Sequence, residues 1–287
     1  MARERRRVIS KLVRSMVRKL FRAAGLDVRR IASGSTVQTR VSLREALEHV
    51  GSVGFAPCTV IDVGAAYGSF TRLCREVFPD ARYFLIEPLD EYRPLLEQLK
   101  RSVPSVHYTM AAASHREGEL AINVHPDLVG SSLYREVEAG TGVNGVTRVV
   151  RGVTVDKVIR EAGAAGPFLV KLDVQGAEVD ALKGAEQTLL ASECVILEVS
   201  FFKFFQDAPE CADTMAYMKD RGFVPYDIVG LQYRPLDRAL SQVDILFVKQ
   251  EGLFRRCHGY ATAEQRHAQN ERMQEYLDQL FAGQHHD

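Results

Sequence analysis

The sequence predicts an α/β fold in which helices cover both faces of a mostly parallel β-sheet. Short apolar segments alternate with helical segments along most of the chain, which is typical of parallel sheets wrapped on both faces. The segment VIDVGAAYGSF, residues 60–70, has the pattern of a buried strand, a glycine turn and the start of a helix. At 287 residues, the chain is long enough for one large domain of this kind with additional segments at its ends.

The first half of the chain alternates regularly between helix and strand. GSVGFAP breaks the opening helix before the first strand, and Pro79 stops the helix that follows the glycine turn. The third strand, HYTMAAAS, ends in small residues. The expected elements are helix 42–50, strand 60–63, helix 70–77, strand 83–88, helix 90–100 and strand 107–114.

An insertion interrupts this alternation near the middle of the chain. Residues 118–151 are rich in Gly, Ser, Thr and Val, which favours a hairpin-like insertion that includes the GSSL loop at 130–133. The alternation resumes with a helix for which Thr154 is a suitable N-cap. The last strand, 243–250, is expected to be antiparallel and at the end of the strand order. The other expected elements are strand 168–174, helix 179–190, strand 194–201, a helix ending near Arg221, strand 223–229 and helix 264–281.

A nucleotide-binding corner is predicted where the first strand meets its helix. Gly64 and Gly68 remove side chains from the turn, and a helix starting near Ser69 offers unpaired N–H groups to a ligand. Dinucleotide-binding chains use G-x-G-x-x-G, whereas the order here is D-x-G-x-x-x-G, with Ala66 in place of the middle glycine. The carboxylate of Asp62 suits a cationic ligand better than a phosphate. S-adenosylmethionine fits this corner, because it carries a sulfonium and an amino group and no phosphate.

An acid at the end of the second strand supports this interpretation. Glu87 lies 23 residues after Gly64, close to the separation of about 20 at which an acid binds ribose hydroxyls. In the alternative interpretation, Asp62 caps a helix and Glu87 is a solvated acid at a strand end. The order and spacing of the two acids favour cofactor binding.

The segment KLDVQGAE, residues 171–178, is the second candidate site. Lys171 and Asp173 share one face of a strand that is expected to be buried, so both need partners or a ligand. Asp173 falls at the carboxyl end of the strand, where ligands bind in open α/β sheets, and it could accept a hydroxyl proton as a general base. In the alternative interpretation, Lys171 and Asp173 form an internal ion pair, and Glu178 only stabilises the N-terminus of the next helix.

These segments together resemble the FkbM family of S-adenosylmethionine-dependent methyltransferases. The resemblance covers residues 59–249, and its most specific part is the K-[IL]-D-V-x-G-x-E block followed by L-x-G-A. It implies a class I methyltransferase fold, Rossmann-like, with a seven-stranded sheet that contains one antiparallel strand. It also implies O-methylation of a hydroxyl on a sugar, glycan, lipid or natural product. The segments that carry it are VIDVGAAYGSF, FLIEP, SSL, TVDKVI, FLVKLDVQGAEVDALKGAEQTLL and VILEVSF.

The resemblance further implies roles for individual residues. Gln175 is a departure, because relatives usually carry Glu there, and the change removes a carboxylate between Asp173 and Glu178. Asp173 remains the candidate catalytic residue. The implied binding residues are Asp62, Gly64, Ala65, Gly68 and Ser69 at the methionine end, Glu87 at the ribose, Ala112 to Ser114 beside the adenine, and Ser131 and Ser132 on the substrate side.

The net charge of zero hides an uneven distribution. Residues 1–30 contain 11 Lys and Arg and two acids, so the rest of the chain has a net charge of −9. Apolar residues recur at helical spacing from Val8 to Phe21, with most basic residues off that stripe. This pattern predicts a basic amphipathic helix, for which there are three alternative roles. It could contact an anionic membrane surface, dock on the enzyme body or a partner subunit, or act as an organelle-targeting segment.

Composition indicates the cellular compartment and excludes some classes of binding partner. Five scattered cysteines without a C-x-x-C pair favour a reducing, cytoplasmic compartment over a disulfide framework or zinc site. No apolar run approaches the length of about 18 residues that a membrane-spanning helix needs. The acidic body lacks a basic stripe interleaved with aromatic residues, which argues against nucleic acid. We expect a small-molecule or glycan acceptor, a domain over residues 42–250, and a helical tail over 251–287.

Other functions remain open. The missing middle glycine and the carboxylate of Asp62 argue against a nicotinamide-dependent oxidoreductase. The presence of both Asp62 and Glu87 argues against a catalytically silent binding module. Asp173, Glu178 and Glu198 could converge on a divalent cation. Because nothing in the sequence fixes that convergence, no metal is assigned.

Overall fold

The computed structural model describes residues 40–138 and 142–283. The chain divides into two units, Met1–Arg40 and Val41–Asp287, and the fold belongs to the second unit. The predicted basic helix over residues 1–30 lies outside the described residues. None of the helices in the described part of the chain has both the length and the apolar character needed to cross a bilayer.

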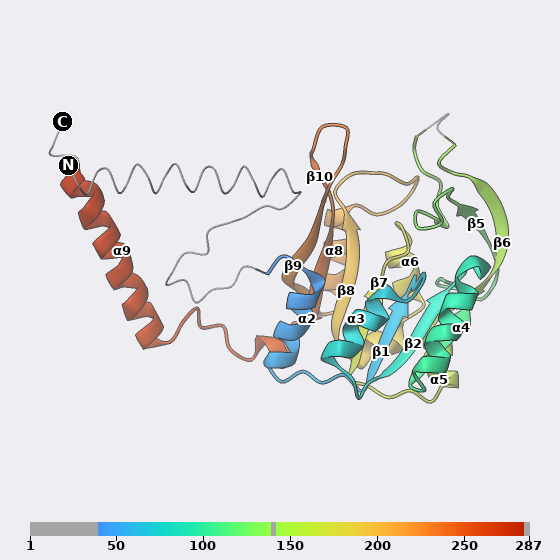
Figure 1. Cartoon of the computed structure of the whole chain (residues 1–287), viewed down its shortest axis with the longest axis horizontal. Helices are drawn as coiled ribbons and strands as arrows, with labels where there is room; N and C mark the ends of the chain where they lie inside the picture. Colours follow the sequence, from blue (N-terminus) through green and yellow to red (C-terminus); the bar gives the residue numbers. More distant parts are fainter. Residues whose placement is uncertain (1–39, 139–141, 284–287) are drawn as a thin grey trace. The chain divides into compact units, whose positions relative to one another are not determined.

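A seven-stranded sheet forms the centre of the fold (Figure 1). Its strands are β1 (Thr59–Val63), β2 (Arg82–Glu87), β3 (Val106–Met110), β7 (Phe168–Leu172), β8 (Ser192–Ser200), β9 (Phe223–Tyr233) and β10 (Leu240–Lys249). Their order is β3-β2-β1-β7-β8-β10-β9, and β10 runs antiparallel to both of its neighbours. The predicted seven-stranded sheet with one antiparallel strand is therefore confirmed.

The predicted position of the antiparallel strand at the end of the order is wrong. β10 lies between β8 and β9, so β9 forms the edge of the sheet (Figure 1). Pro225, within β9, has no N–H to donate, and a proline is tolerated in a strand mainly at a sheet edge. The proline in FVPYDIV is thus the sequence feature that indicates the edge.

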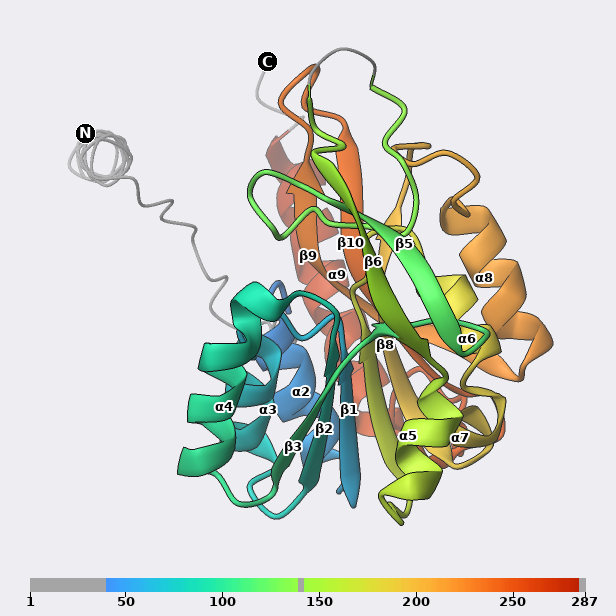
Figure 2. The ribbon, with the colours of Figure 1, turned by 90° about the vertical axis from the view of Figure 1, so that its right-hand side faces the viewer.

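Helices cover both faces of the sheet (Figure 2). One face carries α2 (Leu43–Ser52), α3 (Ser69–Val77) and α4 (Arg93–Ser102), and the other carries α5 (Val155–Glu161), α6 (Glu178–Lys183), α7 (Glu186–Leu190) and α8 (Cys211–Asp220). Side chains of β1 alternate between two cores: Val60 packs in one core, and Ile61 and Val63 pack in the other. A strand buried on both faces explains why β1 is apolar at every position except Thr59 and Asp62.

Two predicted helices differ in detail. The helix predicted over 179–190 is divided into α6 and α7, because the carboxylate of Asp156 accepts hydrogen bonds from the N–H groups of Gln187 and Thr188 and so caps a new helix. The helix predicted over 90–100 begins as a 3₁₀ turn, η1 (Asp90–Tyr92). After β10 the chain continues through a second 3₁₀ turn, η2 (Leu253–Arg255), to the C-terminal helix α9 (Ala263–Gly283).

The predicted insertion forms a β-hairpin. β5 (Gly118–Val124) and β6 (Val146–Val153) pair antiparallel, and β4 (Ala112–Ala113) joins β6 in a separate three-stranded sheet. The strand predicted over 107–114 is therefore wrong at its end, because Ala112 and Ala113 pair with β6 and leave the central sheet. Ile122 and Val124 pack with Leu89 and Tyr92 in a small core of their own. This packing places the insertion beside the turns that follow β1 and β2.

Candidate active site

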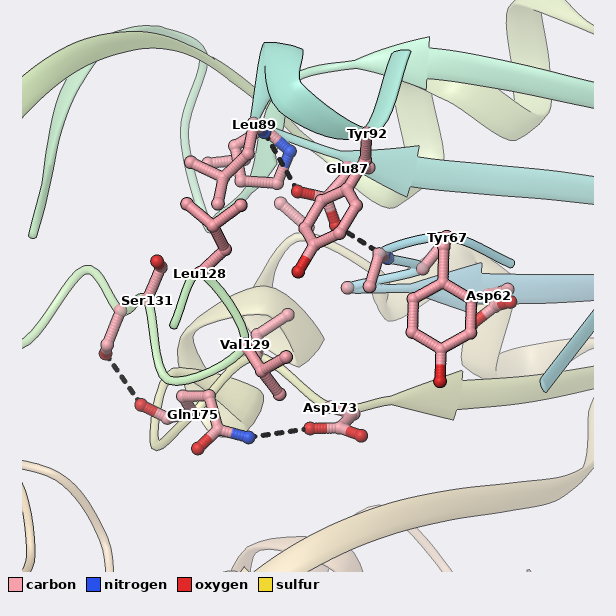
Figure 3. Close-up of a pocket in the computed structure, with 18 of the residues that line it drawn as sticks. Asp62, Tyr67, Glu87, Leu89, Tyr92, Leu128, Val129, Ser131, Asp173 and Gln175 are labelled. Atoms are coloured by element: carbon pink, nitrogen blue, oxygen red, sulfur yellow. Dashed lines mark hydrogen bonds between the residues drawn. The ribbon is translucent and has the colours of Figure 1, made fainter. Parts of the chain in front are cut away.

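A pocket opens at the carboxyl ends of β1, β2 and β7, beside the insertion (Figure 3). This is the position at which ligands bind in open α/β sheets. Its empty volume, including the open mouth, is about 930 Å³. The predicted residues that line it are Asp62, Gly64, Ala65, Ser69, Glu87, Ala112, Ala113, Ser131, Ser132 and Asp173.

The glycine turn brings the two predicted motifs into backbone contact. Gly64 has a φ of 76°, and a Cβ there would lie 1.9 Å from the carbonyl oxygen of Asp173. The N–H of Asp173 donates to the carbonyl of Val63 at 3.0 Å. Gly68, with a φ of 79°, does not line the pocket, and a Cβ there would lie 2.7 Å from Leu99 Cδ2. Glycine at 64 is therefore required by the contact between β1 and the end of β7.

Asp62 is a buried carboxylate with one unpaired oxygen. It is 1% exposed, and the hydroxyl of Thr71 donates to its Oδ2 at 2.6 Å. Its Oδ1 has no hydrogen-bond partner within the described residues. Burial raises the pKa of Asp62, although the charge of Lys171 opposes this. An unpaired buried acceptor is costly, so Oδ1 fits a donor from a ligand, such as an ammonium group.

Glu87 is held by backbone N–H groups. Ala66 donates to its Oε2 and Leu89 to its Oε1, each at 2.8 Å (Figure 3). Burial raises the pKa of Glu87 to about 7. Each carboxylate oxygen has a second lone pair, so both could accept a further hydrogen bond from a hydroxyl. The side chain is therefore fixed in place and fits a ribose diol.

The sequence left open whether Asp173 faces a ligand pocket or forms an internal ion pair, and in the structure it does both. Lys171 Nζ lies 2.8 Å from its Oδ2, which is the ion pair of the alternative interpretation. Its side chain is nevertheless 32% exposed and lines the pocket, whereas that of Lys171 is 8% exposed. Although burial opposes the charged form, the carboxylates of Asp173 and Asp62 raise the pKa of Lys171 to about 12. Lys171 is therefore a charged partner that orients Asp173.

Not all of the small residues predicted for the site line the pocket. Ala112 lines the pocket, but Ser114 does not, because its buried hydroxyl donates to Asp180 Oδ2 at 2.8 Å. Ser131 lines the pocket and accepts a hydrogen bond from the His125 N–H at 3.0 Å. The hydroxyl of Ser132 donates to the carbonyl of Gln175 at 2.6 Å. The pocket is thus formed jointly by the insertion and the turn after β7.

Several lining residues were not predicted. Tyr67 lies within the glycine turn and Tyr92 within η1, and their ring centroids are 6.5 Å apart. Leu128 and Val129 reach the same space from the insertion (Figure 3). Position in the glycine motif was an available signal for Tyr67, whereas contacts from the insertion depend on tertiary structure.

The sequence left open whether Asp173, Glu178 and Glu198 converge on a divalent cation. Among the described residues, no group of three or more His, Cys, Asp or Glu side chains is arranged to hold a metal ion. Glu178 instead accepts hydrogen bonds from the N–H groups of Val174 and Gly176. Its carboxylate therefore fixes the turn after β7.

The fold and the site define a class of protein. A sheet of this order, with a glycine turn after β1 and acids at the ends of β1 and β2, is the nucleoside-binding framework of class I methyltransferases. Residues 62–225 match the family profile described as "Methyltransferase FkbM domain". Because this match covers more than half of the chain, the chain belongs to the FkbM methyltransferase family. The cofactor of this family is S-adenosylmethionine, and the unpaired oxygen of Asp62 and the position of Glu87 fit it.

Solved structures with similar folds have low identities to this chain. An FkbM methyltransferase from Methylobacillus flagellatus is 17% identical, with a TM-score of 0.40, over 65% of this chain and 43% of that one. Fibrillarin from Aeropyrum pernix, solved with natively bound S-adenosyl-L-methionine, is 12% identical, with a TM-score of 0.41, over 71% and 74% of the two chains. Magnesium protoporphyrin IX methyltransferase from Synechocystis, solved with the same compound, is 11% identical, with a TM-score of 0.41, over 82% and 96%.

This chain therefore spans less than half the length of the Methylobacillus protein that it matches. A search of curated proteins found no match.

Proposed function

We propose that this protein transfers a methyl group from S-adenosylmethionine to a hydroxyl on a sugar, glycan, lipid or natural-product acceptor. The observation that carries the proposal is the arrangement of acids in one pocket. Asp62 offers an unpaired buried oxygen at the glycine turn, and Asp173 is partly exposed in the same space. The first fits a cationic ligand, and the second can accept a proton.

The cofactor would be held by groups of four kinds. Asp62 would accept hydrogen bonds from its ammonium, and the N-terminus of α3, which has no side-chain cap, would face its carboxylate. Glu87 would accept from the ribose hydroxyls, and Ala112 would lie beside the adenine. When bound, the cofactor supplies a methyl group that is already activated by a positive sulfur.

The protein must then align the acceptor and remove its proton. Alignment of reacting groups can lower a barrier by roughly 7–11 kcal/mol. Asp173 would accept the hydroxyl proton, while Lys171 holds its Oδ2 and so fixes the carboxylate. Ser131 and Ser132 lie on the insertion side of the same pocket, where the acceptor would enter.

A binding experiment separates this proposal from its alternatives. Isothermal titration calorimetry of the full chain with S-adenosylhomocysteine and with NAD should show binding of the first only. The N–H of Ala66 is already used by Glu87, which leaves fewer donors at the turn for a pyrophosphate. Tight binding of NAD would contradict the proposal, and binding of neither compound would support a silent module. Transfer of a labelled methyl group to a panel of hydroxyl compounds would then identify the acceptor.

Cofactor binding is expected to depend on pH through Glu87. Below its pKa of about 7 the group is protonated, and it must lose that proton before both oxygens can accept ribose hydroxyls. The affinity for S-adenosylhomocysteine should therefore rise by about tenfold from pH 6 to pH 8. Glu87→Gln should weaken binding and remove this rise, as calorimetry at several pH values would measure.

Glu97→Gln is the matched control, because Glu97 lies on α4 and does not line the pocket. It should keep the pH dependence of the unmodified protein. If Glu87→Gln also kept it, Glu87 would not be the titrating group.

A further inference from the structure

Gln175 lies between two acidic side chains of neighbouring strands. Its Nε2 donates to Asp173 Oδ1 at 2.9 Å and to Glu198 Oε2 at 3.0 Å. A side-chain amide nitrogen has two hydrogens, so it can donate to both at once. Figure 3 shows the amide of Gln175 directed toward Asp173 at the edge of the pocket. With Lys171 on Oδ2, both oxygens of Asp173 then have a donor.

The backbone holds Gln175 in this position. Its φ is 53°, in the left-handed region that residues with side chains seldom adopt. Its carbonyl accepts the hydroxyl hydrogen of Ser132 at 2.6 Å, which ties the turn to the insertion. Backbone of this kind persists only where the surrounding contacts fix it, and here they direct the amide between the two carboxyl groups.

The charges around this bridge explain why a neutral residue suits it. Among the charged groups that act most strongly on Glu198, Asp173, Glu178 and Asp244 are acids and Lys171 is a cation. Burial, with the charge of Asp173 in addition, raises the pKa of Glu198 to about 8. A carboxylate at 175 would add one more negative charge, whereas the amide donates to two acids. Asp62 and Asp244 act on Lys171, and Lys203 lines the space beside Glu198 and Gly176.

We propose that Gln175 is a positioning residue for Asp173. Its amide fixes Oδ1 of the carboxylate, with Glu198 as the anchor on the other side, so that Asp173 stays turned toward the pocket. This proposal rests on the proposed function, in which Asp173 receives the acceptor proton.

A matched control is available at Gln232, because Glu198 accepts hydrogen bonds from other side-chain amides besides that of Gln175. Gln232 Nε2 donates to its Oε1 and Gln242 Nε2 to its Oε2, each at 3.0 Å. Gln232 lies on β9 and has no hydrogen bond to Asp173. Gln232→Glu therefore adds a carboxylate beside Glu198 alone, whereas Gln175→Glu adds one beside Glu198 and Asp173.

The test is an NMR titration of the full chain with ¹³C-labelled Asp and Glu carboxyl groups. Asp173→Asn and Glu198→Gln assign the two signals. Gln175→Glu should move the titration midpoints of both Asp173 and Glu198 upward by about one pH unit, and Gln232→Glu should move that of Glu198 alone. An unchanged Asp173 midpoint in Gln175→Glu, or equal effects of the two variants, would overturn the proposal.

A second variant covers the case in which Gln175→Glu does not fold. Gln175→Gly keeps the left-handed backbone and removes the amide, so the Asp173 midpoint should rise by about half a pH unit or more. No rise in this variant would equally overturn the proposal. Calorimetry with S-adenosylhomocysteine on the unmodified chain tests the proposed function separately, since the titration needs no cofactor.

Discussion

Replacing Gly64 by alanine should destabilise the protein by about 3–5 kcal/mol and abolish cofactor binding. Two costs add at this position. The backbone has a φ of 76°, which an alanine adopts at a cost of about 1–2 kcal/mol. The new Cβ would also lie 1.9 Å from the carbonyl oxygen of Asp173, so β1 and the end of β7 would have to separate. A folded domain is typically stable by only about 5–15 kcal/mol, so the loss should be large in a denaturant titration.

Gly54→Ala separates the two costs. Gly54 has a φ of 93°, and a Cβ there would meet no atom within 4 Å. This variant should lose about 1–2 kcal/mol and bind S-adenosylhomocysteine normally. Equal losses in the two variants would mean that backbone strain, and not the contact between the two strands, accounts for the effect at Gly64.

Asp173→Asn is expected to slow methyl transfer by about a hundred- to ten-thousand-fold. The asparagine keeps the size of the side chain but cannot accept the acceptor proton. Because Asp173 is assigned to the acceptor side of the pocket, the affinity for S-adenosylhomocysteine should change by less than about threefold. Rates from a labelled-methyl assay and affinities from calorimetry would give the two numbers.

Asp207→Asn is a suitable control for this change. Asp207 is exposed, it lies outside the pocket, and its φ of 60° is one that asparagine accepts. Its substitution should leave both rate and affinity unchanged. Parallel losses of rate and affinity in Asp173→Asn would indicate that Asp173 supports the pocket as a scaffold and does not take part in proton removal.

Local sequence pattern predicted the framework of the fold well. Strand, glycine turn and helix at residues 60–70 are a contiguous unit whose conformation depends on neighbouring residues, and the structure has them where the pattern placed them. The same is true of Thr154, whose side chain accepts the hydrogen bond of Lys157 N–H as a helix N-cap. Features of this kind need no knowledge of distant contacts.

Features that depend on pairing across the chain were harder to predict. The sequence 107–114 is uniformly suited to a strand, and only the pairing of Ala112 and Ala113 with β6 divides it. The role of Gln175 depends on Glu198, which is 23 residues away on another strand. Ser114 is a small residue like its neighbours, and its bond to Asp180 comes from the packing of α6 against the end of β4.

The hydrogen bond from Ser132 to the carbonyl of Gln175 limits how acceptor specificity could be redesigned. The insertion is the natural segment to exchange between relatives, because it forms a hairpin with its own small core. A transplanted hairpin without a hydroxyl at this position would release the turn that follows β7. Chimeras should therefore retain Ser132, or a threonine there, so that a new acceptor preference does not come at the expense of turnover.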